Sequence, residues 1–217
     1  MKVDITPHRP MCLQCFLKKS HCICQSIKKI KSPINVIILQ HFKERNKSIG
    51  TEKIIRLSLT NSKTIRGIDF NQNPIIKNIQ SDKDNEIYLL YPNENAQNAS
   101  QVNINSDTKK YLIVIDGTWT QAKQIVKLNP WLKDLPTIQL DLPMISQYKI
   151  RTQPFAMCLS TVEAITYCLE QMEKQPEKYK TLLLTFNKMI ERQCQYIPLE
   201  HLENRPKYRK LKKGKTK

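Results

Sequence analysis

Four cysteines near the N-terminus form the densest group of side chains that could bind a metal. Cys12 and Cys15 are followed, after six intervening residues, by Cys22 and Cys24. Four thiolates this close in sequence can complete a tetrahedral zinc site without any other ligand. Because closed four-thiolate sites are structural, we expect residues 1–32 to form a small zinc-binding module.

Other fates are open to the cysteines. An iron–sulfur cluster or two disulfides are the rivals to zinc, and His8 or His21 could replace one thiolate. A cytosolic setting, where thiols stay reduced, argues against disulfides, and four cysteines make the histidines unnecessary. The remaining cysteines are scattered, and we expect each to be buried as a small apolar side chain: Cys158, Cys168 and Cys194.

A second group with chemical potential follows a predicted buried strand and opens a predicted helix. It consists of Asp116, Gly117, Thr118 and Trp119. In open α/β sheets, ligands bind at the carboxyl ends of the strands, so a carboxylate here is well placed to contact a substrate or cofactor. The alternative is structural, with Asp116 or Thr118 capping the helix and Trp119 in the core. These residues alone favour the structural alternative.

Two further polar segments could contribute to the same edge of a sheet. Residues 159–164 have the pattern of a capping box, which leaves backbone N–H groups able to hold a carboxylate or a ribose hydroxyl, and Arg151 lies shortly before them. Taken singly, this is only a well-capped helix. His41, with Glu44 and Arg45, follows another predicted strand and forms either a polar rim or a solvated loop.

Hydrophobic patterns predict the elements that position these groups. Near-continuous apolar runs predict strands covered on both faces, at residues 34–40, 64–70, 86–91 and 111–116. Helical spacing follows Thr51 and Thr118, and the capping box opens a third helix toward Met172. Strands that alternate with helices indicate an α/β fold with a mainly parallel sheet.

Composition limits the class of protein. The 217 residues suit one main domain, and 36 Lys and Arg against 19 acidic residues give a net charge of +17. Such an excess favours nucleic acid as partner, although a merely basic surface explains it almost as well. No stretch approaches the roughly 18 apolar residues of a membrane helix, and no signal-peptide core precedes the module. The sequence predicts a cytoplasmic protein with no membrane partner and no obligate protein partner.

Together these motifs resemble the DTW-domain family of tRNA-uridine aminocarboxypropyltransferases. The resemblance runs in family order over roughly residues 9–175 and is carried by Cys12, Cys15, Cys22 and Cys24; Leu39-Gln40-His41 with Glu44 and Thr51; Leu90-Tyr91-Pro92; Asp116, Thr118 and Trp119; and Arg151 with Leu159-Ser160-Thr161-x-Glu163-Ala164. Phe42 and Gly50 depart from the family, which often has Pro and Asn there. Because most of the chain is covered, the resemblance reverses the structural reading of Asp116.

The resemblance implies a fold and a reaction. The implied fold is similar to that of the knotted, SPOUT-like methyltransferases, in which the chain threads a loop to build the cofactor pocket. The implied reaction moves the 3-amino-3-carboxypropyl group of S-adenosylmethionine to N3 of a uridine in tRNA and releases 5′-methylthioadenosine. The catalytic domain would span residues 33–204, after the structural Zn²⁺ module at 1–32. Independently of the resemblance, the lysine-rich composition of residues 205–217 predicts a basic, disordered tail.

The resemblance also implies roles for individual residues. Asp116 is the candidate base for the N3 proton, and Thr118 and Trp119 complete the catalytic set. The residues expected to bind S-adenosylmethionine are Leu90, Tyr91, Pro92, Asp116, Gly117, Thr118, Leu159, Ser160 and Thr161. The residues expected to contact the tRNA are His41, Glu44, Arg45 and Arg151. Arg151 could instead pair with the cofactor carboxylate.

Two other functions stay open on the sequence. An RNA methyltransferase of related fold would use the same cofactor but release S-adenosylhomocysteine. A non-catalytic, zinc-bearing RNA-binding module would leave nucleosides unchanged and would give no role to residues 116–119. In the aminocarboxypropyl transfer that the resemblance implies, the acceptor N3 lies on the Watson–Crick edge. The target uridine must therefore be unpaired or turned out of its stack.

Overall fold

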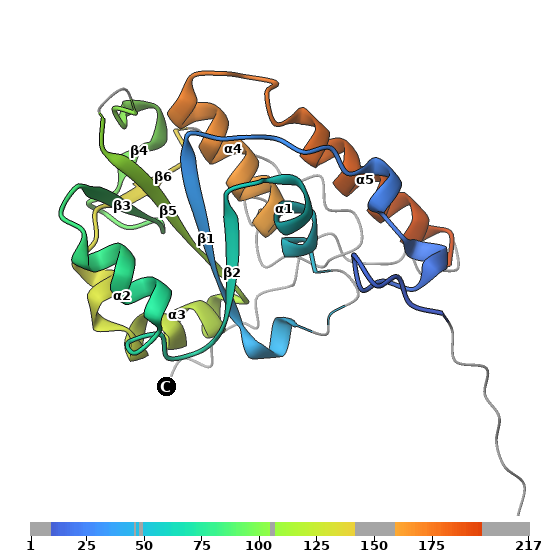
Figure 1. Ribbon diagram of the computed structural model, residues 1–217, viewed down its shortest axis with the longest axis horizontal. Helices are drawn as coiled ribbons and strands as arrows, with labels where there is room; N and C mark the ends of the chain where they lie inside the picture. The colour runs from blue at the N-terminus through green and yellow to red at the C-terminus, as the bar shows by residue number, and fades with distance from the viewer. Residues whose placement is uncertain (1–9, 46, 48–49, 105–106, 142–158, 197–217) are drawn as a thin grey trace, which may run out of the picture.

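A parallel six-stranded sheet forms the centre of the computed structural model, which describes residues 10–45, 47, 50–104, 107–141 and 159–196 (Figure 1). The strand order is β2-β1-β5-β3-β6-β4, and every neighbouring pair is parallel. The strands are β1 (Ile34–His41), β2 (Ser62–Gly67), β3 (Asn85–Leu90), β4 (Gln97–Asn98), β5 (Lys109–Asp116) and β6 (Thr137–Gln139).

Helices cover both faces of the sheet. The α-helices are α1 (Glu52–Ser58), α2 (Pro74–Ser81), α3 (Trp119–Leu128), α4 (Thr161–Glu173) and α5 (Lys180–Cys194). The 3₁₀ helices are η1 (Lys19–His21), η2 (Cys24–Ser26), η3 (Phe42–Glu44), η4 (Ala99–Gln101) and η5 (Pro130–Lys133). Figure 1 shows α2 and α3 on one side of the sheet and α1, α4 and α5 on the other.

Strands β1 and β5 are buried on both faces, which explains their continuous apolar runs. On β1, Ile37 and Leu39 join the hydrophobic cluster that contains α2 and α3 residues. Val36 and Ile38 join a larger cluster that contains residues of α1, α4 and α5. Because successive strand side chains point to opposite faces, one strand supplies both cores.

The N-terminal segment packs against the helices of the larger cluster. Its buried side chains Cys15, Leu17 and Ile23 belong to that cluster. On α5, Thr185 Oγ1 donates a hydrogen bond to the backbone oxygen of Ser26 at 2.8 Å. The module is thus held against the body of the fold through apolar contacts and a helix-to-loop hydrogen bond. The proposed division at residues 32 and 204 stays a prediction.

The structure confirms the predicted α/β fold with a parallel sheet. The strand predicted at 64–70 ends earlier, at Gly67, because Phe70 turns into the smaller core and its N–H donates to Asn129 Oδ1 at 2.6 Å. The helices after Thr51, Thr118 and Ser160 are present. Helices α2 and α5 and strands β4 and β6 were not predicted.

The knotted topology implied by the resemblance stays a prediction, because residues 142–158 lie outside the described part of the chain. The same holds for the disorder predicted at 205–217, which also lies outside it. Within the described residues, every helix is too short or too polar to cross a bilayer.

Candidate active site

The carboxyl ends of β1 and β5 lie at a point where the connections diverge. From β1 the chain passes through α1 to β2 at one edge of the sheet, whereas from β5 it passes through α3 to β6 on the other side of β3. Helices α1 and α3 lie on opposite faces. Such a switch point leaves a crevice where α/β proteins bind ligands.

Asp116 ends β5 at this point and is buried, with 8% of its surface exposed. Its Oδ2 accepts a hydrogen bond from Gln40 Nε2 at 2.8 Å, and its Oδ1 accepts one from Thr161 Oγ1. The carboxyl group therefore lies where β1, β5 and the N-terminus of α4 meet. Hydrogen bonds from two other elements, β1 and α4, fix its orientation.

Burial is the main influence on the protonation of Asp116. It raises the pKa of the carboxyl group from its ordinary 3.8, because the ionised form is poorly solvated there. The hydrogen bonds from Thr161 and Gln40 oppose the shift, whereas the carboxylates of Glu44 and Glu52 add to it. A raised pKa brings a carboxylate closer to the range in which it acts as a general base near neutral pH.

The residues after Asp116 divide into a helix cap and an exposed ring. Thr118 caps α3 through a capping box, in which Thr118 N donates to Gln121 Oε1 at 2.6 Å and Gln121 N donates to Thr118 Oγ1 at 3.3 Å. Gly117 leaves room for this box, because a Cβ there would lie 3.0 Å from Gln121 Cβ. The cap is therefore Thr118, and Asp116 is free for another role.

Trp119 is 45% exposed, so the alternative that placed it in the core is wrong. Its ring meets Tyr91 edge to face, with centroids 6.3 Å apart. Tyr91 follows β3 and is half-buried, as is Leu90 at the end of that strand, whereas Pro92 is exposed. Two aromatic rings thus stand beside the carboxyl ends of β3 and β5, where they could stack on a planar ligand.

The predicted capping box at α4 is present. Glu163 Oε2 accepts hydrogen bonds from Ser160 N at 2.8 Å and from Ser160 Oγ at 2.6 Å, and both residues are buried. Leu159 before them is half-buried. Because the box holds the start of α4 rigidly, Thr161 at the first helical position is directed at Asp116.

The polar residues after β1 are mostly buried. His41 is 1% exposed; its Nδ1 accepts from Lys43 N at 3.2 Å, and its Nε2 faces Gln124 Oε1 at 3.3 Å. Glu44 is 9% exposed and pairs with Lys47 at 2.6 Å. Only Arg45 of the trio is exposed. His41 therefore joins β1 to α3, and the solvated-loop alternative is wrong for His41 and Glu44.

Sequence reasoning assigned no role to two residues that contact this group. Gln40 binds Asp116, and its Oε1 accepts from Arg66 Nε at 2.9 Å. A polar residue that ends the apolar run of β1 was a usable signal for Gln40, whereas nothing marked Arg66. Arg151 lies outside the described residues.

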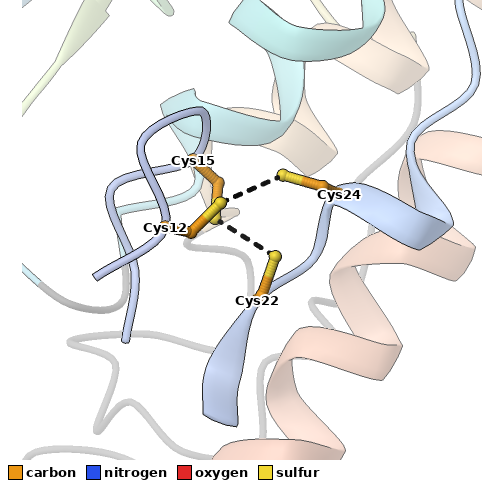
Figure 2. A group of neighbouring side chains, drawn as sticks. All are labelled: Cys12, Cys15, Cys22 and Cys24. Atoms are coloured by element: carbon orange, nitrogen blue, oxygen red, sulfur yellow. Dashed lines mark hydrogen bonds between the residues drawn. The ribbon is translucent and has the colours of Figure 1, made fainter. Parts of the chain in front are cut away.

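The four N-terminal cysteines converge as predicted (Figure 2). All four Sγ atoms lie within 4.8 Å of one another, with Cys12 and Cys24 at 3.7 Å and Cys15 and Cys22 at 3.8 Å. A tetrahedral zinc with Zn–S bonds of about 2.3 Å requires sulfur atoms about 3.8 Å apart. The cluster therefore fits one zinc ion, and its cysteines are free thiols rather than disulfides.

The backbone around the cluster favours its thiolate form at one ligand. Hydrogen bonds from the amides of Cys15 and Gln14 lower the pKa of the Cys12 thiol to about 6. Burial raises the pKa of Cys24, which a bound cation would offset. Elsewhere, Cys168 is fully buried as expected and Cys194 only partly, while Cys158 lies outside the described residues.

Comparisons with known proteins agree with the motifs. The DTW domain family model matches residues 9–194. The chain is 31% identical to tRNA-uridine aminocarboxypropyltransferase 2 of Drosophila melanogaster, covering 93% of this chain and 82% of the relative. It is 28% identical to the Macaca fascicularis protein of the same name (100% and 76% covered) and 24% identical to tRNA-uridine aminocarboxypropyltransferase A of Arabidopsis thaliana (94% and 88%). No solved structure gives a significant match.

Proposed function

Because the chain belongs to the DTW-domain family, we propose that it is a tRNA-uridine aminocarboxypropyltransferase. The names of its relatives support this activity, and their matches span nearly the whole chain. The proposed donor is S-adenosylmethionine, and the proposed acceptor is N3 of a tRNA uridine. The observation that carries the proposal is the buried carboxyl group of Asp116 at the switch point of the sheet.

In the proposed reaction, N3 of uridine forms a bond to the terminal carbon of the aminocarboxypropyl arm. The bond between that carbon and sulfur breaks, its electron pair stays on sulfur, and 5′-methylthioadenosine leaves. The N3 proton moves to Asp116. A positioned general base typically contributes ~10²–10⁴-fold to such a step, and the raised pKa of Asp116 suits the task.

The surrounding residues have proposed roles in binding. The segments expected to hold S-adenosylmethionine come from β3, β5 and α4, which converge near Asp116: Leu90, Tyr91, Pro92, Gly117, Thr118, Leu159, Ser160 and Thr161. The exposed ring of Trp119 is suited to stacking on adenine or on the turned-out uracil. S-adenosylmethionine has more than one carbon bonded to its sulfur. The binding site decides which of them is transferred by placing that carbon in line with N3.

The charge of +17 supports an RNA substrate, since tRNA presents a dense array of phosphates. Arg45 and Arg151 remain proposed contacts to it, whereas the burial of His41 and Glu44 limits them to the support of that surface. In the N-terminal module, the four cysteines would hold Zn²⁺, which would stabilise the fold and take no part in the transfer. We propose a cytoplasmic location, where tRNA is found.

Nucleoside mass analysis of tRNA incubated with the pure protein and S-adenosylmethionine tests this function. We expect one uridine to gain an aminocarboxypropyl group, with an equal amount of 5′-methylthioadenosine released. A methylated nucleoside with S-adenosylhomocysteine would make the protein a methyltransferase instead. Unchanged nucleosides in tRNA that binds the protein would reduce it to an RNA-binding module.

A further inference from the structure

Gln40 is a buried amide, 2% exposed, with a charged side chain on either side. Its Oε1 accepts a hydrogen bond from Arg66 Nε at 2.9 Å, and its Nε2 donates to Asp116 Oδ2 at 2.8 Å. In the sheet, Gln40 is the register partner of Arg66 on β2 and of Asp116 on β5. The three side chains therefore form a row across adjacent strands.

The hydrogen bonds along this row can run in only one direction, from Arg66 through Gln40 to Asp116. An arginine side chain carries only donors and keeps its charge at all physiological pH values. If the Gln40 amide were reversed, its NH₂ group would face the N–H of Arg66 and its oxygen would face the oxygen of Asp116. Arg66 thus forces Gln40 to donate toward Asp116. Oδ2 of Asp116 is held permanently as an acceptor.

The other oxygen of Asp116 has a partner that can adapt. Oδ1 accepts from the hydroxyl of Thr161, and a hydroxyl can donate or accept because its hydrogen rotates. When a proton arrives at Oδ1, Thr161 Oγ1 can accept it in a hydrogen bond and turn its own hydrogen elsewhere. Gln40 offers no such freedom at Oδ2.

We propose that Gln40 and Arg66 are positioning residues that direct the substrate proton to Oδ1 of Asp116, and that Thr161 accommodates it there. This inference rests on the proposed role of Asp116 as the base. The N3–H bond of uridine breaks, its proton forms a bond to Oδ1, and the electron pair left on N3 forms the new bond to carbon. The electrons of the broken carbon–sulfur bond stay on sulfur.

The row also acts against the other charges around Asp116. The carboxylates of Glu44 on η3 and Glu52 on α1 favour its protonated form, as burial does. The hydrogen bonds from Gln40 and Thr161 favour the ionised form that a base requires. On α4, Glu163 is bound to the Ser160 cap, and on β1, His41 faces Gln124 of α3. Loss of the row should therefore raise the pKa of Asp116 further.

Arg66→Met tests the row, because Arg66 is exposed on the edge strand β2 and its replacement should leave the fold intact. Arg66→Lys is the matched control, since lysine is also a donor-only cation. We expect Arg66→Met to raise the pKa of Asp116, measured by carboxyl ¹³C NMR of the protein alone, and Arg66→Lys to raise it less. The acidic limb of the pH profile of kcat/KM should move upward with it.

The NMR titration tests the hydrogen-bonded row, and the pH profile of kcat/KM tests Asp116 as the base, so the two ideas can fail separately. An unmoved Asp116 titration in Arg66→Met would overturn the row, whatever the activity does. A titration that moves while the activity profile stays in place would keep the row but remove Asp116 as the base.

A second pair of variants tests the role of the Thr161 hydroxyl at Oδ1 of Asp116. Thr161→Val should lower kcat at least ~10-fold and Thr161→Ser only a few-fold, with the KM for tRNA unchanged in both. Equal kcat values in the two variants would remove Thr161 from the proton path.

Discussion

The cysteine cluster and the carboxyl edge of the sheet are both small polar groups in a largely apolar protein, yet they are assembled in different ways. The cluster draws all its members from residues 12–24, on loops and short 3₁₀ helices. At the sheet edge, Asp116 is 76 positions from Gln40 and 45 from Thr161. A metal can organise a local segment that has little core of its own, whereas the sheet edge exists only after the whole α/β core has formed.

The two regions should also contribute differently to the protein. Binding of zinc by four thiolates is itself folding free energy, so the cluster should add stability. Burial of a carboxylate costs free energy, so the ionised form of Asp116 should lower the stability of the fold. Variants in the two regions should therefore separate stability from activity.

The largest effect is expected from loss of the metal, because apparent zinc binding energies in such modules reach ~10–16 kcal/mol. We expect about one zinc per chain by elemental analysis and a lower melting temperature after chelation or in Cys22→Ser. Cys194→Ser, which changes a partly buried thiol outside the cluster, is the control. A Cys22→Ser variant that melts like the parent would make the cluster irrelevant to stability and break the contrast.

Asp116→Asn should do the opposite, removing activity but not the fold. The amide can turn its oxygen toward Gln40 Nε2 and its NH₂ toward Thr161 Oγ1, so both contacts can persist. It cannot accept the N3 proton, so transfer should fall by at least ~10². Turnover and tRNA binding are measured beside Asp134→Asn, an exposed carboxylate used as control. Turnover within a few-fold of the parent would exclude Asp116 as the base.

The smallest effect is expected in the pH dependence of stability. Because burial raises the pKa of Asp116, the folded state binds this proton more tightly than the unfolded state does. The resulting contribution to stability is complete below the ordinary value of 3.8 and is lost as pH rises through the folded pKa, where the destabilising ionised form appears. Relative to the parent, Asp116→Asn should therefore gain stability as pH rises from about 4 toward neutral. Denaturant unfolding at several pH values measures this. If the stability of Asp116→Asn relative to the parent fell as pH rises, the folded protein would prefer the ionised form of Asp116.

Local patterns were enough to predict much of this protein. The cysteine spacing predicted a cluster in which all four sulfur atoms lie within 4.8 Å of one another, and the Ser160–Glu163 pattern predicted a capping box that is present. The apolar runs predicted strands β1 and β5, because a strand that is covered on both faces needs apolar side chains on both. Weaker signals failed: the short strands β4 and β6 have little pattern of their own, and the strand at 64–70 was placed too far along the chain.

The sequence by itself determined the four-cysteine cluster, the parallel α/β class and the family, because each depends on residue types at short spacing or on ordered motifs. Only the tertiary structure decided what surrounds Asp116. The strand order and register align Arg66, Gln40 and Asp116, and the capped start of α4 brings Thr161 to the same carboxyl group. Side chains so far apart along the chain meet only through the packing of the whole core, and no local pattern records that packing.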